Sequence, residues 1–154
     1  MPSAKHRPAP EVQAIAEELI PKYHQHLIDF SVRLEYVFLD KTPKSKGMEI
    51  WGRCRKVSGL NAFLANKQEG SDPFFVIEIS EPIWDILPPE CRMALVDHEL
   101  CHAAAEAAQD EDDDESDPVK LSVNPHDLEE FCCIVRRHGM WRDNVKSFIE
   151  AAKQ

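Results

Sequence analysis

The segment DHELCHA, Asp97–Ala103, most constrains what this chain can fold into. It places His98 and His102 four residues apart, with Glu99 directly after the first histidine. On an α-helix, residues four apart project from the same face, so both imidazoles can reach one metal ion. The H-E-x-x-H spacing therefore predicts a helix that carries a zinc site, with Glu99 as the base that takes a proton from water.

Residues that favour a helix surround this motif. Pro88 and Pro89 suit a first helical turn, and neither Gly nor Pro follows as far as Gln109. We therefore predict one helix over residues 88–109, with the histidines at the edge of a buried region. Apolar contacts of this helix are expected from Met93, Leu95, Val96 and Leu100.

A third metal ligand is expected downstream, because an open catalytic zinc site takes three protein ligands. The candidates His126, Glu129 and Glu130 all lie in HDLEEFCCIVRRHG, where a second helix is predicted. Asp127 and Glu130 fit a D-x-x-E capping box, and Gly139 fits the helix end. Because imidazole suits zinc and Glu130 already has a structural role, this reasoning favours His126 over Glu130 and then Glu129.

The rest of the chain predicts a helix followed by short strands. Helical spacing of apolar residues runs from Pro10 to about Phe30, with Pro21 expected to bend or divide this helix. Strands are predicted over 33–40, 48–57 and 74–80, and a final helix over 143–152. A turn and loop is predicted over 59–73, within which NAFLA could extend the second strand or form a short helical turn. This order indicates an α+β fold with a short, mainly antiparallel sheet of about three strands and helices after it.

Length and charge indicate one domain over residues 1–154, with a flexible N-terminus over 1–9. Seven acidic residues crowd into DEDDDESD, Asp110–Asp117, which predicts a solvated acidic loop over 109–118. No apolar signal region and no run of about 18 apolar residues is visible, so we expect a cytosolic protein without a membrane span.

The five cysteines are odd in number and lack C-x-x-C spacing. This argues against a disulfide framework and against a zinc ribbon. We expect most of them, including Cys101 and the adjacent Cys132 and Cys133, to be buried thiols.

Basic residues cluster around Trp51 in the segment Lys41–Lys56. Such a segment could contact a nucleic-acid backbone, although an ordinary exposed hairpin is favoured because no recognised nucleic-acid motif accompanies it.

Two motifs carry a resemblance to known families. HELCH followed by HDLEEF resembles the SprT-like zinc metalloproteases, in which a third histidine begins the next helix in H-G-x-x-F; here H-D replaces H-G. EYVF, PKSKG, FFVIEIS, ALVDHELCH and RRHGMW make residues 30–142 even more similar to the phage metallopeptidase family. The resemblance implies a small zincin-like α+β domain, with His98, His102 and His126 as zinc ligands and Glu99 as the base.

Two classes of function follow from these observations. The first is a zinc metallopeptidase that hydrolyses protein or peptide substrates, in the bacterial host cytosol if it is phage encoded. The alternative is a zinc-stabilised module with little turnover that binds protein or nucleic acid. Retention of Glu99 favours the peptidase, because a structural zinc site needs no such carboxylate. Tyr36, Arg136, Arg137 and His138 are candidates for stabilising an oxyanion, and no spacing rule chooses among them.

Overall fold

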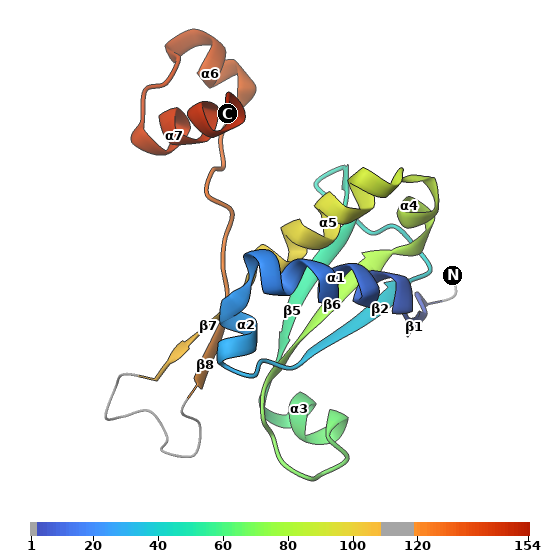
Figure 1. The fold of residues 1–154 in the computed structure, drawn as a ribbon. Helices are drawn as coiled ribbons and strands as arrows, with labels where there is room; N and C mark the ends of the chain where they lie inside the picture. The colour runs from blue at the N-terminus through green and yellow to red at the C-terminus, as the bar shows by residue number, and fades with distance from the viewer. Residues whose placement is uncertain (1–2, 109–118) are drawn as a thin grey trace. The chain divides into compact units, whose positions relative to one another are not determined.

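Residues 3–108 and 119–154 are described in a computed structural model, shown in Figure 1. They divide into two units, Met1–Asn124 and Pro125–Gln154. The acidic segment Asp110–Asp117, predicted to be a solvated loop, lies outside the described residues.

A four-stranded sheet forms the centre of the first unit (Figure 1). Its order is β1-β2-β6-β5, with bounds His6–Pro8, Leu34–Leu39, Phe74–Ser80 and Gly52–Val57 respectively. Strand β6 runs parallel to β2, whereas β1 pairs with β2 and β5 with β6 in antiparallel fashion. The predicted α+β class is confirmed, and the sheet gains a fourth strand because His6–Pro8 pairs with β2.

One face of this sheet carries the hydrophobic core. Phe75, Ile77 and Ile79 of β6 alternate along the strand and are fully buried. Helices α1 (Pro10–Tyr23) and α5 (Pro89–Cys101) contact each other and add their apolar residues to the same core. Both helices therefore cover the same face of the sheet.

The predicted N-terminal helix is divided, though not at Pro21. Pro21 lies within α1, and the break falls at His24, before the short helix α2 (Gln25–Asp29). The backbone of His24 is not helical, with φ of −131°, and its side chain is buried. The chain therefore changes direction at a residue whose imidazole lies inside the protein.

The predicted strand over 48–57 is also divided. Strands β3 (Lys44–Ser45) and β4 (Met48–Glu49) form a small hairpin, and β5 begins only at Gly52. Within the predicted 59–73 loop, NAFLA forms a helix rather than extending the strand, as part of α3 (Gly59–Ala65). A short helix, α4 (Glu81–Ile86), follows β6. The clearest predicted strand, Phe74–Ser80, is confirmed with the predicted bounds.

The helix predicted over residues 88–109 is confirmed only as far as the H-E-x-x-H motif. Helix α5 ends at Cys101, and the alanine-rich segment after it forms strand β7 (Ala103–Ala107), paired with β8 (Val119–Val123). Alanine favours helix locally, but backbone pairing with β8 and burial of Ala103 and Leu121 stabilise the strand instead.

The second unit contains helices α6 (Cys132–His138) and α7 (Asp143–Ala152). The predicted bounds of α7 are confirmed, and so is the stop at Gly139, which has φ of +66°. The predicted capping box is wrong, because α6 begins after Glu130. A carboxylate oxygen of Glu130 instead accepts a hydrogen bond from the backbone N–H of Phe131 at 2.9 Å.

The expectation that most cysteines are buried is wrong. Cys54 is half-buried, and Cys91, Cys101, Cys132 and Cys133 are exposed; none forms a disulfide bond. Among the described residues, no helix is long and apolar enough to cross a membrane.

Replacing Ile77 by alanine is expected to lower the free energy of unfolding by about 2–5 kcal/mol, because it opens a cavity in the core. Ile77 is 0% exposed, whereas Ile86 on α4 is 76% exposed. Ile86→Ala is therefore the matched control and should change stability by less than about 0.5 kcal/mol. Denaturant unfolding followed by circular dichroism measures both, and equal losses would contradict this placement of the core.

Candidate metal centre

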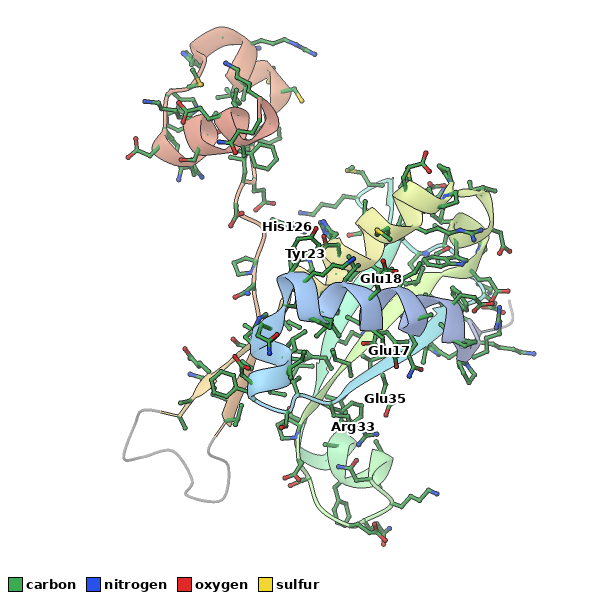
Figure 2. The ribbon with its side chains drawn as sticks, in the orientation of Figure 1. Glu17, Glu18, Tyr23, Arg33, Glu35 and His126 are labelled. Atoms are coloured by element: carbon green, nitrogen blue, oxygen red, sulfur yellow. The ribbon has the colours of Figure 1, made fainter. Side chains whose placement is uncertain are left out.

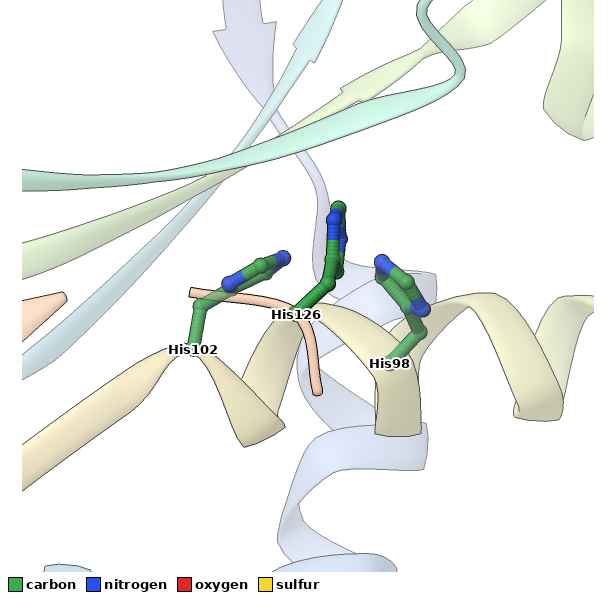
Figure 3. Close-up of side chains that lie close together, drawn as sticks. All are labelled: His98, His102 and His126. Carbon is green, nitrogen blue, oxygen red and sulfur yellow. The ribbon is translucent and has the colours of Figure 1, made fainter. Parts of the chain in front are cut away.

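The last turn of α5 presents the two histidines of the H-E-x-x-H motif. Their ring centroids lie 5.2 Å apart in an edge-to-face arrangement, and both imidazoles project from the same side of the helix (Figure 3). His98 is exposed and His102 is half-buried. The pair therefore lies at the edge of the buried region, as the sequence predicts.

Asn124 holds the end of α5 through three hydrogen bonds. Its backbone N–H donates to the carbonyl of His102 at 2.7 Å, and its side-chain amide donates to the carbonyl of Cys101 at 3.2 Å. Its own carbonyl accepts from Nδ1 of His102 at 2.6 Å. Because Nδ1 then carries the proton, Nε2 of His102 carries the lone pair that a metal needs.

The β7–β8 ladder explains why Asn124 reaches this helix end. Ala103, directly after His102, pairs with Val123, directly before Asn124. A hydrogen bond from Nε2 of His26 on α2 to the carbonyl of Ala103, at 2.8 Å, holds the start of β7 against α2. Strand pairing thus joins two segments that the sequence separates by about twenty residues.

His126 follows Asn124 by two residues, a span of at most about 7 Å in extended chain. His126 is thus close in the chain to the residue that orients His102, but it belongs to the second unit. Of the other predicted candidates, Glu129 is exposed and Glu130 is bonded to the next residue in the chain.

The donor set fits a divalent transition metal. Imidazole nitrogens in a tetrahedral zinc site lie about 2.0–2.1 Å from the metal, and so about 3.4 Å from one another. The hydrogen bond from His102 to a backbone carbonyl is the kind of outer contact that orients metal-binding histidines.

Glu99 points into the protein between α5 and β5. Its side chain is only 4% exposed, and it packs against the backbone of Gly52. A Cβ atom at Gly52 would lie 3.0 Å from Oε1 of Glu99 and 2.9 Å from Cδ1 of Ile79. Glycine is therefore required for this close approach. The sequence offered no signal for the roles of Gly52 or Asn124, since neither belongs to the motif.

Burial sets the protonation of this carboxyl group. Removal from water raises the pKa of Glu99 from 4.5 to about 7, and the charge of a protonated His102 opposes the shift. A carboxyl group with this pKa exchanges its proton near neutral pH, which suits a general acid–base.

Of the four sequence-based candidates for oxyanion stabilisation, Tyr36 is not brought to this carboxyl group. Tyr36 lies on β2, which β6 separates from β5, so it is roughly 10 Å from the strand that contacts Glu99. Burial raises the pKa of Tyr36 to about 12, and the charges of Glu17 and Glu35, which are labelled in Figure 2, add to the shift. The other three candidates, Arg136, Arg137 and His138, form the last turn of α6 in the second unit.

Basic side chains of the Lys41–Lys56 segment are exposed on the β3–β4 hairpin and on β5, as with Lys44, Lys46 and Arg55. Contact with nucleic acid through this segment stays a prediction.

Glu99→Gln is expected to stabilise the metal-free protein increasingly as pH rises from about 4.5 to about 7. In this range the folded state keeps the Glu99 proton while the unfolded chain loses it, so the wild type loses stability with rising pH. The difference should reach about 3 kcal/mol and stay constant above pH 7. Denaturant unfolding in the presence of a chelator measures it, with the exposed Glu69→Gln as control. A pH-independent difference would contradict the raised pKa.

Comparison with known proteins identifies the family of the chain. The family model described as "Putative phage metallopeptidase" matches residues 4–153. No curated protein and no solved structure was found to match. The similarity to SprT-like proteases stays a prediction. Because the family model spans nearly the whole sequence, the chain belongs to the putative phage metallopeptidase family.

Proposed function

We propose that the chain is a zinc-dependent peptidase in which His98, His102 and His126 hold the metal and Glu99 is the general base. The observation that carries the proposal is the pair of imidazoles, His98 and His102, at the end of the helix that also carries a buried carboxyl group. Membership of a metallopeptidase family supports a metal-dependent peptidase. The imidazole-only donor set favours zinc among the common divalent ions.

Zinc, when bound, supplies Lewis-acid chemistry: it acidifies water and polarises a carbonyl group near neutral pH. Glu99 would take the proton of the attacking water and return it to the leaving amine. The packing of its side chain against Gly52 would hold the carboxyl group in place for both transfers, first as a base and then as an acid.

The surrounding residues position these groups. Asn124 fixes the ring of His102 through Nδ1, and Gly52 leaves room for Glu99 to lie against β5. The exposed side chain of His98 leaves this end of α5 accessible to solvent, so a chain segment of a protein or peptide substrate can approach it. The family description also supports a phage-encoded enzyme, which would act in the cytosol of the bacterial host.

His102→Ala and His126→Ala are each expected to bind one zinc ion fewer per chain than the wild type, because two imidazoles hold zinc more weakly than three. Glu130→Ala is the matched control and should keep the wild-type zinc content, since its carboxylate accepts a bond from Phe131. Inductively coupled plasma mass spectrometry on protein expressed with added zinc measures all four. Zinc lost in Glu130→Ala but kept in His126→Ala would overturn the assignment of the third ligand.

Glu99→Gln is expected to keep the zinc content of the wild type and to lower kcat/KM by about 10²–10⁴-fold, because the amide cannot accept the proton of water. Fluorescently labelled, denatured casein serves as a general protein substrate. The exposed Glu69→Gln variant controls for loss of a carboxylate elsewhere in the first unit.

Equal cleavage rates for the wild type and Glu99→Gln would argue against Glu99 as the base. If both bound zinc and neither cleaved any protein, the alternative of a zinc-stabilised binding module would replace the peptidase.

A further inference from the structure

A second cluster of metal-ligating side chains lies on a neighbouring face of α5. It consists of His24, from the junction of α1 and α2, with Asp97 and Cys101 from α5. One potential ligand atom from each lies within 4.8 Å of the others. All three residues belong to the first unit, so the cluster is formed within one folded body.

Packing has already placed two of the three side chains. His24 is 4% exposed, and its Nε2 lies 2.6 Å from Oδ1 of Asp97. This buried imidazole comes from the point where α1 breaks, whereas Asp97 is half-buried and Cys101 is exposed. The cluster therefore has a fixed inner ligand and an open outer side through which an ion can enter.

Imidazole, carboxylate and thiolate together form a ligand set for zinc and related ions, with sulfur selecting against magnesium and calcium. In a tetrahedral site these atoms lie about 2.0–2.3 Å from zinc, and so about 3.3–3.8 Å apart. To bind zinc, the ligand atoms of His24 and Asp97 would move apart by less than about 1 Å. The distances from the ligand atom of Cys101 to those of His24 and Asp97 would shorten by about 1 Å. Rotation of Asp97 and Cys101 about their side-chain bonds supplies such movements, with water as a fourth ligand.

The geometry of α5 places Asp97 and Cys101 on a different face of the helix from the two histidines of the motif. Asp97 and Cys101 each precede one histidine of the motif by one residue, which turns them by about 100° around the helix axis. Both pairs have the i, i+4 spacing that directs side chains to one face. Helix α5 thus presents one ligand pair on each of two adjacent faces.

We propose that His24, Asp97 and Cys101 form a second zinc site, distinct from the three-histidine centre. An ion bound there would join the α1–α2 junction to the last turn of α5, where the other centre is held. The proposal rests on the geometry of the first unit alone and does not depend on the proposed peptidase activity.

Cobalt substitution tests the proposal with a signal that only sulfur ligation gives. Thiolate bound to Co²⁺ absorbs in the near ultraviolet, whereas a site of three histidines has no sulfur to produce this charge-transfer band. We expect wild-type protein titrated with Co²⁺ under reducing conditions to bind two ions per chain and to show the band. Cys101→Ser should abolish the band and bind one ion fewer, while His102→Ala should bind one ion fewer and keep the band.

Matched variants separate the cluster from its surroundings. Cys91→Ser removes another exposed thiol of α5 that is outside the cluster, and it should keep both the band and the stoichiometry. Asp97→Asn can still hydrogen-bond to His24 but removes the anionic ligand, so it should weaken cobalt binding at this site at least tenfold. Circular dichroism confirms that each variant folds. A wild type without the band, or a band that persists in Cys101→Ser, would overturn the proposal whether or not the three-histidine site binds metal.

Discussion

The candidate centre depends on the attachment of Asn124 to the end of α5. Helix α5 carries His98 and His102, but its last carbonyls need partners and its second imidazole needs a fixed orientation. Asn124 meets both needs, with two donated hydrogen bonds to the helix end and one accepted from Nδ1 of His102. The same residue begins the short connection to His126. One strand pairing, β7 with β8, thus positions the residue that caps the helix and orients the ring of His102.

A second constraint comes from the close packing of α5 on the sheet. Gly52 on β5 lets the side chain of Glu99 lie against the strand, where burial raises the pKa of its carboxyl group to about 7. The same packing brings α1 beside α5, and the inward turn of His24 at the end of α1 meets Asp97 there. The core therefore determines the chemistry on two faces of one helix: the protonation of the base and the position of a buried imidazole.

Predictions from the sequence succeeded where local pattern and tertiary packing agree. The apolar run of Phe74–Ser80 forms the buried strand that its composition predicts, and the amphipathic segment Asp143–Ala152 forms the helix that its spacing predicts.

Predictions from the sequence failed where tertiary contacts override the local propensity. Ala103–Ala107 is a strand because β8 pairs with it, and residues 127–131 stay outside α6 despite a plausible capping box. The four exposed cysteines lie on solvent-facing sides of α5 and α6. The spacing of the apolar residues around them did not predict which side of each helix would face solvent.

The sequence by itself determined the α+β class, the helix that carries the H-E-x-x-H motif and the residue types of the proposed ligands and base, because these depend on residue type and local spacing. Only the tertiary structure decided that Asn124 holds the end of α5, that Gly52 accommodates Glu99 and that His24 joins Asp97 and Cys101. Each of these contacts unites residues that are 20 to 80 positions apart. Such contacts arise from strand pairing and helix packing, which short-range patterns do not encode.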